Sequence, residues 1–189
     1  DAFVPADEHI FSELNIHYYL SRAAEAGKEG ALQGSITILR EGIKKYPSNK
    51  KLVNNLAYYT ERIVLRHART GAYEKALALA DKVSAAYPET THLFTDNRIS
   101  ILHNLTVKHL KAGSLSEAAA YLQQLAALQP RMSVAQHKEL RALRINYLTL
   151  TAASYADKRE YPKAIKALER LIKIAPETTA IANMGYYYN

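Results

Sequence analysis

The chain has 189 residues, of which 48% are hydrophobic and 23% charged, as in a soluble-type globular domain or a short repeat array. It carries 25 Lys and Arg against 18 acidic residues, a net charge of +7, and its lack of Cys excludes disulfides and thiolate metal sites. No apolar run approaches the roughly 18 residues of a transmembrane helix, so we expect no membrane insertion. The chain begins with Asp1 and shows no signal-peptide pattern, so we expect a piece of a longer protein, and its compartment stays unknown.

Helical patterns follow one another along the chain after an irregular lead-in at residues 1–9. Gly and Pro separate them: Gly27 and Gly30 flank one turn, and Gly71 and Gly113 mark two others. The expected helices span about 8–26, 31–46, 49–70, 72–87, 92–111, 114–129, 133–156 and 162–175, and a further helix begins near 178.

Every second helix carries one apolar stripe at helical spacing, which predicts a single buried face. The four stripes are Leu32, Ile36, Leu39 and Ile43; Ala76, Leu77, Ala80 and Val83; Leu115, Ala118, Leu122 and Leu125; and Ala164, Ile165, Leu168, Leu171 and Ile172. Helix starts are marked as well. Ser48 and Asn49 can cap the helix that follows them, Ser114 and Glu117 have the spacing of a capping box, and Pro162 suits a first turn.

Two markers repeat with a long period. Prolines close the second helices at 47, 88, 130 and 176, which gives spacings of 41, 42 and 46 residues. An Asn-x-x-Tyr-Tyr sequence occurs in the first helices at Asn15–Tyr19, Asn55–Tyr59 and Asn183–Tyr187, and Asn97 lies at the matching place without the tyrosines. Such periods are typical of solenoids, in which stacked neighbours complete one continuous core.

At these residues the chain resembles the tetratricopeptide repeat (TPR) family. The resemblance is carried by the apolar-small pairs Leu56-Ala57 and Met184-Gly185, by the closing prolines, and by Gly71-x-Tyr73-x-x-Ala76, Gly113-x-Leu115-x-x-Ala118 and Tyr161-x-x-Ala164. It implies an all-α fold, a right-handed α-solenoid of stacked antiparallel helix pairs. We expect a single domain over 1–189 with repeats at about 8–47, 49–88, 90–130 and 133–176 and a partial one at 178–189. The family period is about 34 residues, so we expect first helices longer by about two turns.

A helical wheel places a polar stripe on the first helix of each repeat, beside the core positions Leu52, Leu56, Thr60, Ile63, Val64 and His67. In the second repeat the stripe is Asn55, Tyr58, Tyr59, Arg62, Arg66 and Arg69; in the third it is Asn97, Ser100, Ile101, Asn104, Lys108 and Lys111. The first repeat contributes Asn15, Tyr18, Tyr19 and Arg22, and in the fourth Lys138, Arg141 and Arg144 share a face.

In some members of the family, an asparagine ladder in the concave groove holds the main chain of a bound peptide. The resemblance therefore implies a peptide-binding role for Asn15, Asn55, Asn97 and Asn183. A carboxamide can pair with a peptide unit whatever its side chain, the cations would favour acidic or carboxylate-bearing ligands, and the tyrosines would supply contact area. The alternative is that these residues are solvated or fill gaps between repeats.

Catalytic and metal-binding patterns are missing from the sequence. The seven His are scattered, and there is no phosphate-binding loop, nucleophile elbow or evident carboxylate pair. We therefore expect no enzyme activity, cofactor or metal. Lys163, Lys166, Arg170 and Lys173 share a face, which we interpret as the solvated outer surface, with an RNA or acidic-membrane patch as the alternative.

The sequence favours a protein-interaction module that holds a peptide or partner segment in its groove. Two other functions stay open. Nucleic acid could bind the basic surface, in which case binding would fall steeply with salt. The chain could also act as a structural linker that self-associates through the truncated last repeat, where Ile181, Met184, Tyr186 and Tyr187 would be uncovered.

Overall fold

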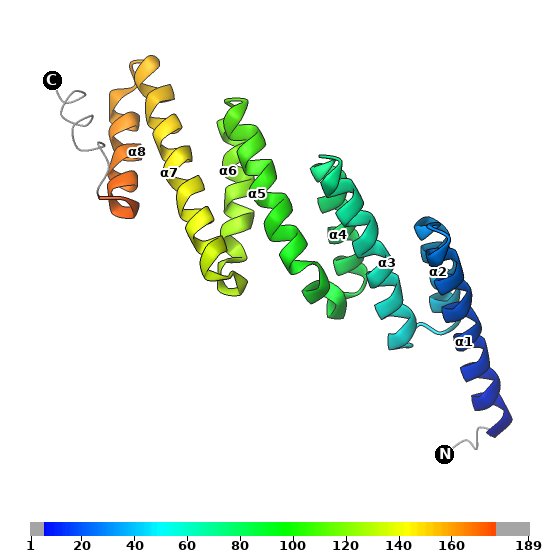
Figure 1. Cartoon of the computed structure of the whole chain (residues 1–189). Helices are drawn as coiled ribbons and strands as arrows, with labels where there is room; N and C mark the ends of the chain where they lie inside the picture. Colours follow the sequence, from blue (N-terminus) through cyan, green and yellow to red (C-terminus); the bar gives the residue numbers. More distant parts are fainter. Residues whose placement is uncertain (1–5, 177–189) are drawn as a thin grey trace. The chain divides into compact units, whose positions relative to one another are not determined.

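The computed structural model describes residues 6–176, and every regular element in that range is helical (Figure 1). Two short 3-10 helices, η1 (Pro88–Phe94) and η2 (Gln129–Arg131), precede α5 and α7. The predicted all-α fold is confirmed. The α-helices are α1 (Ala6–Lys28), α2 (Leu32–Lys45), α3 (Lys50–Arg69), α4 (Tyr73–Ala86), α5 (Thr95–Lys111), α6 (Leu115–Ala127), α7 (Val134–Asp157) and α8 (Tyr161–Ile174).

The helices pack as consecutive antiparallel pairs, α1 with α2, α3 with α4, α5 with α6 and α7 with α8. The chain divides into two compact units, Asp1–Asn97 and Arg98–Asn189, which we call the first and second units. In the first unit α3 also packs on both helices of the preceding pair. The single-domain assignment and the handedness of the superhelix stay predictions, and the partial repeat at 178–189, with Asn183, lies outside the described residues.

The surplus over a 34-residue period precedes the second helix of each pair, as a long first helix or, in the third pair, as α5 with the preceding 3-10 helix η1. The first helices have 23, 20, 17 and 24 residues, whereas the second helices have 14, 14, 13 and 14. No helix in the described range combines the length and the apolar content that crossing a bilayer requires.

The same backbone turn joins the two helices of every pair. Gly30, Gly71, Gly113 and Arg159 occupy it with φ values of 81°, 76°, 72° and 59°. The next N–H then donates to a carbonyl five residues back, at 2.9 Å in each case, as in Ala72 to His67 and Glu160 to Tyr155. This is the Schellman arrangement, which satisfies the last carbonyls of a helix. Successive turn residues are 41, 42 and 46 positions apart, and the closing prolines have the same spacings. The turn therefore sets the register in which the pairs are compared.

The core of the first unit lies between the two layers of helices. All eight residues predicted on the stripes of α2 and α4 are buried, from Leu32 to Val83. Two buried hydroxyls of this core have partners: Ser35 Oγ donates to the Ala23 carbonyl at 2.8 Å, and Thr60 Oγ1 donates to the Leu56 carbonyl at 2.8 Å. The buried Ser84 Oγ has no hydrogen-bond partner among the described residues. The predicted stripes of α6 and α8 are also buried, except that Leu115, Ile165 and Ile172 are half-buried.

Two glycines provide seats for tyrosine rings at the helix contacts. A Cβ built on Gly27 would lie 2.5 Å from Cε1 of Tyr59, and one built on Gly42 would lie 2.9 Å from Cγ of Tyr19. Only glycine leaves this space. Tyr59 therefore joins α3 to α1 of the preceding pair, whereas Tyr19 joins α1 to its own partner α2.

The predicted helix starts are partly confirmed. Asn49 Oδ1 accepts from the Leu52 N–H at 3.1 Å, and Pro162 lies in the first turn of α8. The predicted capping box of Ser114 is wrong, because the Schellman turn leaves Ser114 at ψ 72° and its side chain makes no cap bond. The capping box lies at Ser133 and Gln136, where Ser133 is extended with ψ 165°.

Two helices begin elsewhere than expected. Helix α1 begins at Ala6 instead of residue 8. Helix α5 begins at Thr95 instead of about 92, because Pro88 starts a 3-10 helix that ends in the fully buried Phe94.

The first prediction concerns the seat at Gly27. We expect Gly27→Ala to lower the free energy of unfolding by about 1 kcal/mol, because overpacking against Tyr59 costs more than the roughly 1 kcal/mol gained in helix propensity. Urea denaturation measures this change. In a Tyr59→Leu background the same substitution should be neutral or stabilising. Gly34→Ala is the control, because its Cβ would make only ordinary contacts, at 3.7 and 3.9 Å. This substitution should stabilise the protein.

The second prediction concerns the turn residue Arg159. Because an L side chain is strained at positive φ, Arg159→Gly should stabilise the protein by about 1 kcal/mol. Gly113→Ala, at the equivalent position with open space around the Cβ, should destabilise it by about the same amount. Thermal unfolding of both variants checks the pair, and shifts of the same sign would contradict the shared turn geometry.

Candidate functional site

The exposed side of α3 carries an aromatic and cationic stripe, which we call the α3 stripe: Asn55, Tyr58, Arg62, Arg66 and Arg69. Tyr58 is 49% exposed, the three arginines are exposed, and Asn55 is half-buried. The Arg62 guanidinium carbon lies 5.9 Å from the centroid of the Tyr58 ring, within the range of a cation–π contact. The stripe thus presents a flat ring with a cation above it.

Tyr59 supports this platform from inside the core. Its ring meets the Tyr58 ring edge-on at 5.1 Å and is only 7% exposed, and burial raises the pKa of its hydroxyl. Tyr19 is likewise buried, at 8%. The sequence placed Tyr19 and Tyr59 on the exposed stripe. This placement is corrected, because both rings face neighbouring helices at the glycine seats.

The turn register shows why the tyrosine pairs of α1 and α3 are not equivalent. Counted from Gly30 and Gly71, Tyr59 corresponds to Tyr18, and Thr60 corresponds to Tyr19. The Asn-x-x-Tyr-Tyr sequences are therefore out of register by one residue, about 100° around a helix. The burial agrees, since Tyr19 lies against Gly42 of its own partner helix and Thr60 is buried as well. The proline spacing of 41 residues was the sequence signal that could have revealed this.

In the correct register, α1 exposes the face that α3 buries against the preceding pair. Tyr18 is 52% exposed, and Arg22 Nη1 donates to its hydroxyl at 3.1 Å. The nearby apolar residues Ile10, Phe11 and Leu14 are also exposed, and the sequence analysis did not identify them. Their spacing of i, i+1 and i+4 is that of one helix face, and this was the sequence signal that could have identified them.

The asparagines of the predicted ladder already make hydrogen bonds. The Nδ2 groups of Asn15, Asn55 and Asn104 donate to the carbonyls four residues back, at 2.8, 2.9 and 2.9 Å. Asn97 Nδ2 instead donates to Glu61 Oε1 at 3.0 Å and so joins the start of α5 to α3. Each carboxamide has two N–H donors, so one of them is engaged within the chain. The ladder remains a prediction.

The remaining predicted residues lie in the second unit. Lys108 and Lys111 are exposed on α5, and Asn104 is half-buried beside them. On α7, Arg141 has a structural role, since its Nε and Nη2 donate to the Ile174 carbonyl at 3.2 and 3.0 Å and cap α8.

The electrostatics of the α3 stripe are cationic. Helix α3 contains five Lys or Arg and one acidic residue, Glu61, which already accepts from Asn97. Within the described part of the chain, Arg62, Arg66 and Arg69 form no ion pair. Cations in a last turn also interact favourably with the helix dipole, which accounts for part of this placement. Residues 6–176 contain no cluster of three His, Asp, Glu or Cys that could hold a metal ion.

Comparisons with known proteins were made for the whole chain. Residues 148–178 match the tetratricopeptide repeat family model. A search of curated proteins finds no match. Among solved structures, MamA from Desulfovibrio magneticus RS-1 (residues 41 to the end) is 16% identical with a TM-score of 0.29, and the match covers 92% of this chain and 83% of that one. MamA of MSR-1 is 14% identical with a TM-score of 0.31, and covers 92% and 84%.

The family match begins inside α7 and runs through α8. The fourth pair therefore contains a repeat of family length, and its surplus residues precede the match in the first half of α7. The same Schellman turn and closing proline recur in each earlier pair. The described part of the chain is thus a series of helical pairs, and the last of these pairs contains the residues that match a tetratricopeptide repeat.

Proposed function

We propose that the chain is a protein-interaction scaffold that holds an acidic segment of a partner protein on the α3 stripe. Tetratricopeptide arrays bind partners through the exposed side of their first helices, and α3 is such a helix. No catalytic group is involved. The partner segment is recognised by charge and by stacking.

The observation that carries this proposal is the Tyr58–Arg62 platform. Tyrosine offers a rigid apolar surface at a low entropic cost, and its ring is held by the edge-on contact with buried Tyr59. The guanidinium of Arg62 lies over the same ring, 5.9 Å from its centroid, and keeps its planar fork available to a carboxylate. The platform is therefore ordered before the partner binds, which lowers the entropy lost on binding.

Charge specifies the chemistry of the partner. Arg66 and Arg69 continue the line of cations from Arg62 toward the end of α3, and their side chains are exposed. A row of cations with one carboxylate on the same helix, Glu61, attracts an acidic segment and accelerates its association. Asn55, half-buried at the start of the stripe, still has its Oδ1 and its second N–H to offer to a peptide unit.

The third prediction tests the cations. Acidic peptides should be enriched when the full chain is used to select from a random peptide library. The Arg62→Glu/Arg66→Glu variant should bind the enriched peptides at least about tenfold more weakly, a loss of roughly 1.4 kcal/mol, because attraction becomes repulsion. Fluorescence anisotropy measures the affinity. Thermal unfolding should show a loss of stability of no more than about 1 kcal/mol, because Arg66→Glu places a negative charge in the last turn of α3.

The control for this variant is Lys75→Glu/Lys82→Glu, which makes the same charge change on exposed positions of α4. It should retain the affinity to within a factor of about two, because charges beyond a Debye length are screened. An equal loss in both variants would mean that only net charge matters. Tighter binding of a random-sequence DNA oligonucleotide, with a steep salt dependence, would instead favour the nucleic-acid function.

The fourth prediction separates the ring of Tyr58 from its hydroxyl. If the ring stacks on the partner, Tyr58→Phe should keep the affinity for the enriched peptides, and Tyr58→Ala should lower it about tenfold. Tyr58 is half-exposed, so neither substitution should alter the free energy of unfolding by more than about 0.5 kcal/mol. Loss of affinity in Tyr58→Phe would contradict a stacking role.

A further inference from the structure

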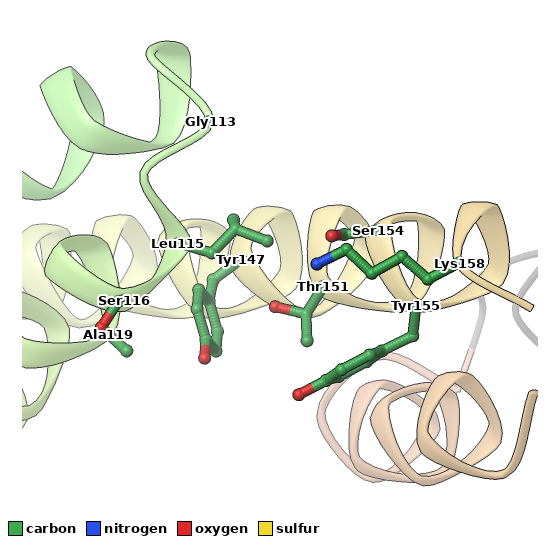
Figure 2. A pocket seen from close by; sticks show the side chains of 9 residues that line it. All are labelled: Gly113, Leu115, Ser116, Ala119, Tyr147, Thr151, Ser154, Tyr155 and Lys158. Carbon is green, nitrogen blue, oxygen red and sulfur yellow. The ribbon is translucent and has the colours of Figure 1, made fainter. Parts of the chain in front are cut away.

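A pocket of 530 Å³ lies in the second unit, between the turn that begins α6 and the C-terminal half of α7 (Figure 2). Its volume is within the range of small-ligand sites. Five hydroxyl side chains and one ammonium group are among its lining groups: Ser116, Tyr147, Thr151, Ser154, Tyr155 and Lys158. Figure 2 shows Lys158 lying back along α7 toward Ser154 and Thr151.

The pocket occupies a place that is closed in the first unit. Counted from the positive-φ turn residues Gly71 and Arg159, Tyr147 corresponds to Tyr59, and Thr151 corresponds to Ile63. Tyr59 and Ile63 are 7% and 5% exposed in the seam between two helical pairs. The equivalent region between α6 and α7 is open and lined by hydroxyl groups. Close packing between helical pairs therefore does not explain the residues found there.

The hydroxyl of Thr151 is unusual among the helical threonines. The hydroxyls of Thr60, Thr106 and Thr149 each donate to the carbonyl four residues back. The Thr151 oxygen is buried and has no hydrogen-bond partner among the described residues. A buried hydroxyl without a partner is unfavourable to folding. A ligand in the pocket can provide the partner after the Thr151 side chain changes rotamer and exposes its oxygen.

Positive charge surrounds this row of side chains. Tyr147, Thr151 and Tyr155 also line a smaller neighbouring pocket of 210 Å³, whose wall includes Lys163, Lys166 and Arg170 of α8. The Lys163 ammonium lies 5.5 Å from the centroid of the Tyr155 ring and pairs with Glu160 at 2.6 Å. The residues that line the two pockets thus include four cations, Lys158, Lys163, Lys166 and Arg170, and no acidic residue.

We propose that this pocket binds a phosphomonoester, either a free phosphorylated small molecule or a phosphorylated side chain of a partner. A phosphate group has three terminal oxygens, all acceptors, and this number suits several hydroxyl donors and an ammonium group better than the two oxygens of a carboxylate. Tyr147 and Tyr155 provide aromatic walls for the group that carries the phosphate. The site lies in the second unit and does not depend on the α3 stripe.

The test is isothermal titration of the full chain with phenyl phosphate. Saturable binding is expected, and Thr151→Val/Lys158→Gln should weaken it at least about tenfold. The matched control is Thr149→Val/Lys138→Gln on exposed positions of α7, which should leave the affinity unchanged. Absence of saturable binding, or equal loss in the control, would overturn the proposal. The Arg62→Glu/Arg66→Glu variant should still bind phenyl phosphate. A failure of the function proposed for the α3 stripe would therefore be distinguishable from a failure of the pocket proposal.

Thr151→Val alone gives a second readout that does not require a ligand. Removing an unpartnered hydroxyl should raise the melting temperature by ~2–4 °C while phenyl phosphate affinity falls. A lower melting temperature together with unchanged affinity would show that Thr151 is only a packing residue and would overturn its role.

Two comparisons define the chemistry and the source of the ligand. Benzoate has the same ring with a carboxylate, and binding as tight as that of phenyl phosphate would overturn the choice of phosphate. A phosphotyrosine peptide that binds more tightly than phenyl phosphate would identify a partner side chain as the source. Equal or weaker binding would identify a free phosphomonoester.

Discussion

The seam between consecutive helical pairs is the constraint on which the rest of the structure depends. A single pair of helices leaves an apolar face uncovered, and only the first helix of the next pair can bury it. In the first unit this contact is made by Tyr59, which enters the space left by the missing side chain of Gly27. Because that ring is fixed, the neighbouring Tyr58 is held edge-on at the surface. A core contact thereby orders the platform of the proposed binding site.

The two units use the same seam differently. In the first it is closed by Tyr59 and Ile63, and in the second the corresponding Tyr147 and Thr151 line an open pocket. Replacing an apolar position by a hydroxyl removes transfer free energy and leaves a polar group to be satisfied. Packing in the second unit is therefore less complete at this place, and a polar ligand could be accommodated there. Repetition of one structural element has produced both a structural contact and a candidate site.

Local features of the fold could be predicted from the sequence. The apolar stripes of α2 and α4, the Asn49 cap and the turn at Gly71 each depend on a few neighbouring residues and on helix geometry, and all are confirmed. The Ser114 capping box was wrong, because a Schellman turn one residue earlier determined the backbone there. Ser133 has the same type of sequence signal and an extended backbone, and it makes the box.

The candidate site was predictable in composition and not in detail. A helical wheel identified the exposed cations of α3 because exposure follows the 3.6-residue period. It wrongly placed Tyr59 beside them, because a helical wheel contains no information about neighbouring helices. Tyr59 is buried by its contact with Gly27, which lies 32 positions away in the chain. The pocket at Thr151 and the one-residue offset between α1 and α3 likewise depend on contacts between separate helices. Sequence alone determined which segments are helical and where they turn, whereas tertiary packing decided which side chains are buried at the seams, since burial there depends on residues that the local pattern does not contain.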